Sequence, residues 1–395
     1  MEPRPHQREG AAWALLAVRE YGLAYLSWQE RTGKTLTALL TVEKSKAKTC
    51  LVITKKKAIP GWQETLAQWE HTTTFTVINY ESVHKIQGVF DFIILDESHH
   101  AISSVGRPSA TWKKVYVLTK GKAILYLSAT PYAEHLGLVY HQLKLSQWTP
   151  FKAYRNFYDW FRMYGIPNLT RTPYGLAETY TKYQDELILK SIDHLFNFKT
   201  RADVGIEHEP QANVVVVPMG ALNLDLIKQL TRDSVIDLPM TDEQIVCDTP
   251  MKERSVHYQI EGGTIKTEGG YVRTGTDKID YIKDNYEQED IVIMAHFIAE
   301  RTILEKAFPH ARILSSDGHA EGVDLHKVKK LIIYSMSFKT SKYTQRLARQ
   351  ANHNRTNPIV VDILVCDKPA IGMEVYKAVA LKKENFDKNS YERIR

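Results

Sequence analysis

The sequence has few cysteines and no long apolar run, and these two absences exclude several classes of protein. Its three cysteines, Cys50, Cys247 and Cys366, lie far apart without Cys-x-x-Cys or Cys/His spacing. That distribution argues against a structural zinc site and favours a reducing compartment. No apolar stretch approaches the ~20 residues of a membrane-spanning helix, and the polar N-terminus lacks an apolar signal segment. We therefore expect a cytoplasmic protein with no membrane partner.

The chain also lacks a strong excess of either charge. Its 52 Lys and Arg against 46 Asp and Glu give a formal net charge of +6, which only weakly favours a polyanionic partner. The balance of 43% hydrophobic and 25% charged residues is typical of a soluble globular protein. A length of 395 residues exceeds one ordinary core and predicts two domains plus an insertion.

Continuous apolar runs predict two groups of strands that are buried on both faces, as in parallel sheets covered by helices. The first group is 23–27, 50–54, 75–79, 91–96 and 123–128, with helices over 33–45 and 62–70. The second group is 291–295, 311–315, 330–334 and 359–365, with helices over 298–307 and 342–351. The pattern predicts two α/β domains, 1–145 and 281–395, with a helical and hairpin insertion over 146–280.

The predicted insertion contains two distinctive stretches. Phe151, Tyr154, Tyr158 and Phe161 recur at helical spacing, and we interpret them as the buried face of an amphipathic helix rather than a base-stacking platform. Residues 260–275, "IEGGTIKTEGGYVRTG", predict a hairpin or an exposed connector.

The stretch "WQERTGKT" at 28–35 resembles a phosphate-binding loop only in its second half. Trp28 stands at the first glycine of the G-x-x-x-x-G-K-[ST] pattern, whereas Gly33, Lys34 and Thr35 are present. A helix N-terminus, a lysine and a hydroxyl for Mg²⁺ are what such a loop needs. The missing glycines remove no catalytic group, provided that Arg31 adopts the required backbone angles.

A second motif, "FIILDE" at 92–97, ends an apolar strand in two carboxylates. We expect Asp96 to hold Mg²⁺ through water, and Glu97 to orient and deprotonate an attacking water. His99 and His100 follow, but adjacent histidines are expected to point apart and no third ligand is near, so no metal site is predicted there.

Together these motifs resemble superfamily 2 helicases and translocases, with "DESH" at 96–99 in place of the DEAD or DEAH box. Within "RPHQREGAAWAL", the resemblance implies that Gln7 reads the adenine edge. "LVITKKKAIPGWQETLAQW" and "VINYESVHK" resemble segments that contact the DNA backbone. "LSATP" resembles the motif that couples hydrolysis to domain movement.

The second half continues the resemblance in order. "IVIMAHF" resembles the first strand of a second motor domain, and "ILSSDGHAEGVDL" the motif that carries Ser315, Gly322 and Asp324 to the interdomain cleft. "QRLARQANHNR" resembles the arginine-finger motif, with Gln345 and Arg349 in register. The family's second arginine falls at Asn352, and Arg355 lies three residues further on.

The resemblance implies two RecA-like domains that bind ATP and Mg²⁺ between them. Two stretches, "LFNFKTRADVG" and "DLPMTDEQIVCDTPMKERSVHYQ", are similar to Swi/Snf-type DNA translocases, and the compact form is similar to bacteriophage members. The implied roles are catalytic for Lys34, Asp96, Glu97, Gln345 and Arg349; nucleotide binding for Gln7, Arg31, Thr32, Gly33, Lys34, Thr35, Gly322 and Asp324; Mg²⁺ binding for Thr35 and Asp96; coupling for Ser128 and Thr130; and DNA binding for Lys55, Lys56, Lys57, Tyr80 and Ser315.

The predicted function is an ATP-dependent DNA helicase or translocase. We expect a monomer that acts on duplex or branched DNA in the cytoplasm of a bacterium or a phage-infected cell. An RNA helicase and the motor subunit of a restriction system remain alternatives. A slow, nucleotide-switched nucleic-acid clamp is a third alternative, and Trp28 and Asn352 are the residues that favour it.

Overall fold

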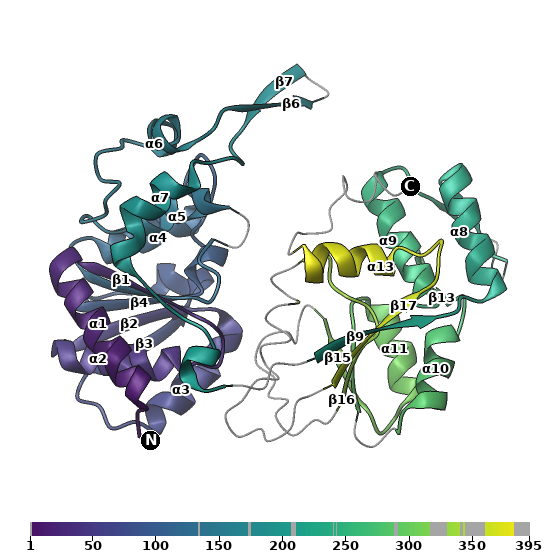
Figure 1. The fold of residues 1–395 in the computed structure, drawn as a ribbon, viewed down its shortest axis with the longest axis horizontal. Coiled ribbons are helices and arrows are strands. Elements are labelled where there is room, and N and C mark those ends of the chain that lie inside the picture. The colour runs from purple at the N-terminus through teal and green to yellow at the C-terminus, as the bar shows by residue number, and fades with distance from the viewer. Residues whose placement is uncertain are drawn as a thin grey trace. The chain divides into compact units, whose positions relative to one another are not determined.

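The computed structural model describes residues 2–132, 135–172, 175–206, 211–239, 241, 243–287, 291–316, 330–339, 343 and 360–382. The chain divides into two compact units, Met1–Glu207 and His208–Arg395, each built on a parallel sheet (Figure 1). The prediction of two α/β domains, each with a parallel sheet, is confirmed. The predicted boundaries differ from these units, because residues 146–207 belong to the first unit and residues 208–280 belong to the second.

The sheet of the first unit is parallel throughout, in the order β3-β2-β4-β5-β1-β8. Its strands are β1 (Leu23–Trp28), β2 (Thr49–Thr54), β3 (Thr74–Asn79), β4 (Phe92–Asp96), β5 (Ala123–Leu127) and β8 (Phe196–Lys199). The first five confirm the strands predicted from apolar runs. β8 was not predicted, because "FNFK" is short and mixes polar with aromatic residues.

Strand alternation sorts the apolar side chains of this sheet into two cores. In β1, Leu23 and Tyr25 join one core, whereas Ala24, Leu26 and Trp28 join the other. Successive side chains of a strand point to opposite faces, so a strand that is apolar throughout must be covered on both sides. The parallel α/β architecture follows from that requirement.

Helices cover both faces of the first sheet. α1, α2 and α3 contribute to the core that contains Trp28, while α4 to α7 contribute to the core that contains Tyr25. α1 packs closely because its buried positions, among them Gly10, Ala11 and Ala14, carry small side chains at helical spacing. The helices are α1 (Pro5–Tyr21), α2 (Lys34–Ser45), α3 (Ile59–Ala67), α4 (Ala110–Thr119), α5 (Val139–Leu143), α6 (Phe157–Tyr164) and α7 (Asp185–Ile192).

The aromatic-rich stretch after α5 forms a shorter helix than predicted. α6 begins only at Phe157, so Phe151 and Tyr154 precede it, although Phe151 is buried. Tyr158, predicted to be buried, is 40% exposed. The buried face consists of Phe157, Trp160, Phe161 and Tyr164. After α6, the antiparallel hairpin of β6 (Asn168–Thr172) and β7 (Gly175–Thr179) extends away from the sheet (Figure 1).

The second unit contains a parallel sheet in the order β15-β14-β16-β17-β9. Its strands are β9 (Gln211–Val217), β14 (Ile291–Ala295), β15 (Arg312–Ser315), β16 (Lys330–Ile333) and β17 (Val360–Cys366). The last four confirm the predicted strands. β9 was missed, although its apolar run "NVVVV" was a readable signal, because residues 146–280 were treated as an insertion.

The predicted hairpin over 260–275 is confirmed as β12 (Thr264–Thr267) and β13 (Gly270–Arg273), and β10 (Val235–Asp237) pairs with β11 (Gln244–Val246). The predicted helix at 298–307 is confirmed as α11, whereas the one at 342–351 lies almost wholly outside the described residues. The helices of this unit are α8 (Ala221–Asp233), α9 (Pro250–Glu261), α10 (Asp277–Asn285), α11 (Ile298–Ala307) and α13 (Gly372–Tyr376). Within the described part of the chain, no helix is long and apolar enough to cross a membrane.

A buried carboxylate joins α9 to α13 in the second unit. Glu261, at the end of α9, accepts hydrogen bonds from the backbone N–H groups of Ile371 and Gly372. Burial raises the pKa of Glu261 to about 7, against the opposing effects of Lys278 and of these two N–H donors, while the Glu300 carboxylate raises it further.

We predict that Glu261→Gln reduces the loss of stability of the second unit between pH 5 and pH 8. A carboxyl whose pKa is raised on folding contributes stability below its unfolded pKa, and that contribution disappears as the pH rises through the folded value. A rise from 4.5 to about 7 corresponds to a loss on the order of 3 kcal/mol. Hydrogen exchange of β9 and β17 amides across this pH range measures it.

Glu374→Gln, at a partly exposed position on α13 beside Lys377, is the matched control and should keep the pH dependence of the original chain. A Glu261→Gln chain whose second unit loses as much stability between pH 5 and 8 as the original would contradict the prediction.

Candidate nucleotide site of the first unit

The carboxyl edge of the first sheet gathers every motif that the sequence places in the first domain. Because the strands are parallel, the segments that follow β1, β2, β4 and β5 all emerge at this edge. They are the phosphate loop, the lysine segment 55–57, the carboxylates Asp96 and Glu97, and the segment 128–130. β4 lies between β2 and β5, so its two carboxylates are flanked by the ends of both neighbours.

Trp28 does not enter the phosphate loop. It is the last residue of β1, it is fully buried, and its ring packs with Leu26 and the residues of α1 and α2. A Cβ at Gly10 would lie 2.4 Å from the Trp28 ring, so the helix can approach only because this residue is glycine. The indole N–H of Trp28 donates to Asn197 Oδ1 at 2.6 Å, on β8. The substitution therefore changes the core beneath the loop and leaves the loop open.

The loop itself uses two left-handed residues. Arg31 has φ 67° and Gly33 has φ 90°, so Arg31 does adopt the backbone angles that the pattern requires. At Gly33 a Cβ would lie 2.2 Å from Gln7 Nε2, so a larger residue would have to displace the Gln7 amide and adopt a strained left-handed backbone. Thr32 Oγ1 donates to the Gln29 carbonyl at 2.7 Å and closes the turn. α2 begins directly after Gly33, and no side chain caps its first N–H groups.

Lys34 lies within the loop that it is predicted to serve. Its Nζ donates to the carbonyl oxygens of Trp28 at 2.6 Å and of Gln29 at 3.0 Å. The ammonium is therefore held at the mouth of the loop by two exchangeable backbone contacts. A cavity of about 390 Å³ opens between the ends of β1, β5 and β8, lined by residues that include Gln29, Thr130 and Lys199, and Lys34 is not part of its lining.

The segment that follows β8 braces the phosphate loop. Gln29 N donates to the Lys199 carbonyl at 2.9 Å, and Arg201 N donates to Gln29 Oε1 at 2.8 Å. Arg201 also lies 3.9 Å from the Glu30 carboxylate. These contacts hold the loop in its turn, a task that glycines perform in the usual pattern.

Gln7, predicted to read adenine, lies against the phosphate loop. Its Nε2 donates to the Gly33 carbonyl at 3.1 Å, and its Oε1 accepts from Arg4 N at 2.9 Å. Gln7 therefore positions Gly33 in this structure. The adenine contact stays a prediction.

Asp96 is the most firmly held group at the sheet edge. Its Oδ2 accepts from Thr54 Oγ1 at 2.7 Å and from Trp62 Nε1 at 3.0 Å, and its backbone carbonyl accepts from the Tyr80 hydroxyl at 3.0 Å. All three donors are buried. The carboxylate is thus fixed through Oδ2, while Oδ1 stays available to a cation or its water shell.

Glu97 is connected directly to the predicted coupling motif. Ser128 Oγ donates to Glu97 Oε2 at 3.2 Å and accepts from Thr130 N at 3.1 Å. Glu97 has φ 51°, a strained left-handed conformation of the kind found at functional sites. Burial, and next the Asp96 carboxylate, raise the pKa of Glu97 to about 7, while Lys55 and Lys34 oppose the rise. Such a pKa suits a general base at neutral pH.

The expectation that His99 and His100 point apart is wrong. Both belong to a 3₁₀ turn, Ser98–His100, and their ring centroids lie 3.9 Å apart. His99 Nδ1 lies 3.1 Å from Ser128 Oγ and 3.6 Å from Glu97 Oε2. Among the described residues, Glu97, His99 and His100 form the one group whose ligand atoms are close enough for a metal ion. His99 is at the same time part of the contact network around Glu97.

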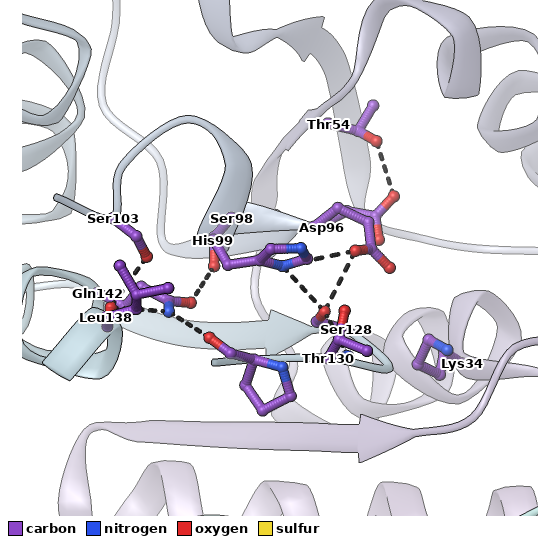
Figure 2. Close-up of polar contacts among 12 residues, drawn as sticks. Lys34, Thr54, Asp96, Ser98, His99, Ser103, Ser128, Thr130, Leu138 and Gln142 are labelled. Atoms are coloured by element: carbon purple, nitrogen blue, oxygen red, sulfur yellow. Dashed lines mark hydrogen bonds and ion pairs between the residues drawn. The ribbon is translucent and has the colours of Figure 1, made fainter. Parts of the chain in front are cut away.

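Gln142, on α5, also belongs to this hydrogen-bond network, and no motif in the sequence predicted that role. Its Oε1 accepts from Ser98 Oγ at 2.8 Å (Figure 2). The same oxygen accepts from the Tyr25 hydroxyl at 3.0 Å, and Gln142 Nε2 donates to the Pro131 carbonyl at 2.7 Å. The amide is fully buried. It therefore ties the segment after Glu97 to the segment after Ser128.

The predicted DNA-contacting residues receive different placements. Lys56 and Lys57 are exposed and Lys55 is partly exposed, at the start of the short turn that leads into α3. Tyr80 is only 3% exposed and its hydroxyl donates to the Asp96 carbonyl, whereas its predicted DNA contact stays a prediction. Ser315, in the second unit, ends β15.

Four residues assigned to the second domain lie outside the described part of the structure. They are Gly322, Asp324, Gln345 and Arg349, and Asn352 and Arg355 lie there as well. Their predicted roles stay predictions.

The residues of the first unit fit a nucleoside triphosphate with Mg²⁺. The uncapped N-terminus of α2 and Lys34 suit phosphate oxygens. Asp96, held through one oxygen, and the Thr35 hydroxyl at the start of α2 supply the oxygen ligands that Mg²⁺ prefers. The sequence identified these groups but missed Thr54, Trp62 and Gln142, whose partners lie far away along the chain.

Comparisons with known proteins found a family match over part of the first unit and similar solved structures. Residues 62–133 match the family described as "Type III restriction enzyme, res subunit", a segment that contains Asp96, Glu97 and Ser128. No curated protein matches the chain. Among solved structures, the SWI2/SNF2 ATPase core domain of Sulfolobus solfataricus matches at 14% identity and a TM-score of 0.44, over 98% of this chain and 90% of that one. The family match confirms the sequence resemblance over residues 62–133.

We predict that Gly33→Ala destabilises the first unit by at least about 1 kcal/mol and weakens nucleotide binding. Alanine at this position would have to keep the left-handed backbone of Gly33, and its Cβ would displace the Gln7 side chain. Urea unfolding and titration with a fluorescent ATP analogue measure the two effects. Gly61→Ala is the control, because its Cβ meets no atom within 4 Å, and alanine within a helix gains about 0.5–1 kcal/mol. Equal behaviour of both variants would contradict the prediction.

Proposed function

We propose that this chain, a superfamily 2 ATPase core, is a motor whose ATP hydrolysis is stimulated by DNA and drives movement along it. One observation supports this most directly. A phosphate-binding helix N-terminus and a fixed Asp–Glu pair lie at one edge of one parallel sheet, and Ser128 joins the pair to the coupling segment. The chemistry of these groups is that of a phosphoryl-transfer site.

In the proposed reaction, the N–H groups at the start of α2 and the Lys34 ammonium bind the β- and γ-phosphates. Lys34 exchanges its contacts with the Trp28 and Gln29 carbonyls for phosphate oxygens. Thr35 and Asp96 hold Mg²⁺, which neutralises charge on the transferring phosphoryl group when bound. Glu97 accepts the proton of the attacking water.

The coupling step is proposed to use Ser128. Its hydroxyl donates to Glu97 and accepts a hydrogen bond from the backbone N–H of Thr130. A change in the protonation or position of Glu97 would therefore shift the backbone of residues 128–130. The catalytic roles predicted for Gln345 and Arg349 stay predictions. Lys55, Lys56 and Lys57 are proposed to meet backbone phosphates without reading sequence.

Within this class, a Swi/Snf-like translocase on duplex or branched DNA is our first candidate. The family matched over residues 62–133 is named for a restriction enzyme subunit, and that name favours a restriction-type motor as the second candidate. Translocation with no nuclease partner supports the first, whereas co-purification with a nuclease subunit supports the second.

We predict that duplex or branched DNA stimulates steady-state ATP hydrolysis and that Glu97→Gln lowers the stimulated rate by about 10²–10⁴-fold, because the general base is lost. ATP hydrolysis is measured without nucleic acid and with single-stranded, duplex and branched DNA and RNA. The exposed Glu70→Gln variant is the control and should retain the full rate.

Each outcome of this panel assigns a function. Strongest stimulation by RNA would replace DNA with RNA as the substrate. If the chain binds ATP but hydrolyses it at a negligible rate with every nucleic acid, the motor proposal is contradicted and the nucleotide-switched clamp is favoured.

A further inference from the structure

We propose that Trp62 is a positioning residue that transmits nucleic-acid binding at the lysine segment 55–57 to the Mg²⁺-holding carboxylate of Asp96. The proposal rests on the proposed function. It begins with one contact: the indole N–H of Trp62 donates to Asp96 Oδ2 at 3.0 Å.

The environment makes this contact specific. Trp62 is 3% exposed and packs in the core between the sheet and the helices α1 to α3. Thr54, fully buried at the end of β2, donates to the same oxygen at 2.7 Å. Two donors on Oδ2 select one rotamer of the carboxylate and direct Oδ1 away from them. Outer partners of this kind orient metal-binding carboxylates, and their loss typically costs about 10- to 100-fold in metal affinity or activity.

The two donors differ in what carries them. Thr54 belongs to a strand that is paired on both sides, so its hydroxyl is fixed by the sheet. Trp62 belongs to α3, which continues directly from the turn Lys56–Ala58. The Ala58 N–H donates to the Lys55 carbonyl at 2.8 Å, so the lysines and Trp62 lie on one short, hydrogen-bonded segment.

A phosphate backbone that draws the lysines toward it therefore acts on α3 and on the Trp62 contact, while Thr54 stays in place. Nucleic acid would in this way tighten the hold on Asp96 and lower the Mg²⁺ concentration that hydrolysis needs. The basic segment and the metal carboxylate are separated by a single hydrogen-bonded side chain.

The test compares Trp62→Phe, which keeps the ring and removes the N–H, with Trp69→Phe. Trp69 lies just beyond α3, and its Nε1 is buried with no hydrogen-bond partner among the described residues. Trp69→Phe therefore removes an indole N–H without removing a hydrogen bond to any of these residues. ATP hydrolysis is measured against free Mg²⁺, with and without a blunt DNA duplex, alongside duplex binding by fluorescence anisotropy and the thermal unfolding midpoint.

For Trp62→Phe we expect a folded chain with a lowered unfolding midpoint and the duplex binding of the original, a half-saturating Mg²⁺ concentration raised about tenfold, and loss of most DNA stimulation. Thr54→Val should raise the Mg²⁺ requirement equally with and without DNA, so that its stimulation ratio is retained, and Thr54→Ser should restore the original requirement. Trp69→Phe should match the original chain throughout.

Outcomes separate this proposal from the proposed function. An original chain without any DNA stimulation defeats the proposed function whatever the variants do. Stimulation of the original chain that Trp62→Phe fully retains, at the original Mg²⁺ requirement, overturns the role of Trp62 alone. If phenylalanine at position 62 prevents folding, Thr54→Val decides, because an unchanged Mg²⁺ dependence there would show that donors on Oδ2 do not control the metal carboxylate.

Discussion

The position of β4 between β2 and β5 is the constraint on which the rest of the site depends. Parallel pairing places the end of β4 beside the ends of both neighbours, so Asp96 meets Thr54 on one side and Glu97 meets Ser128 on the other. A slip of one residue in either pairing would turn Asp96 to the opposite face of the sheet. The apolar residues of β4 are therefore as necessary to the chemistry as the carboxylates, because burial on both faces fixes their register.

The phosphate loop shows how a departure from a motif can be compensated by packing. Glycines normally let such a loop turn tightly, and here Trp28 and Arg31 replace small residues. The chain instead supplies Gly10 as space for the Trp28 ring and uses Asn197, Lys199 and Arg201 to hold the loop. The loop is thereby hydrogen-bonded to residues 199–201, which follow β8. A rearrangement of the loop on phosphate binding would therefore move these residues.

Much of the fold was predictable from residue patterns, whereas part of the site was not. Apolar runs located β1 to β5 and β14 to β17, because strands buried on both faces leave a continuous signal. The direction of the Trp28 side chain was also readable, since it alternates in phase with Ala24 and Leu26. In contrast, the adjacency of His99 and His100 depends on the left-handed backbone of Glu97, and the partners of Asp96 lie 34 and 42 residues away along the chain. Contacts of that range are set by strand order, which one sequence does not state.

The two adjacent carboxylates are suited to different tasks because their surroundings differ. Asp96 receives two buried donors on one oxygen, which fixes its direction and suits it to hold a cation through the other. Glu97 has one hydroxyl donor and a pKa raised to about 7 by burial and by Asp96. A carboxyl whose pKa lies near neutral pH suits the role of a general base. A bound cation beside Asp96 would favour the ionised form of Glu97, so metal binding itself would prepare the base.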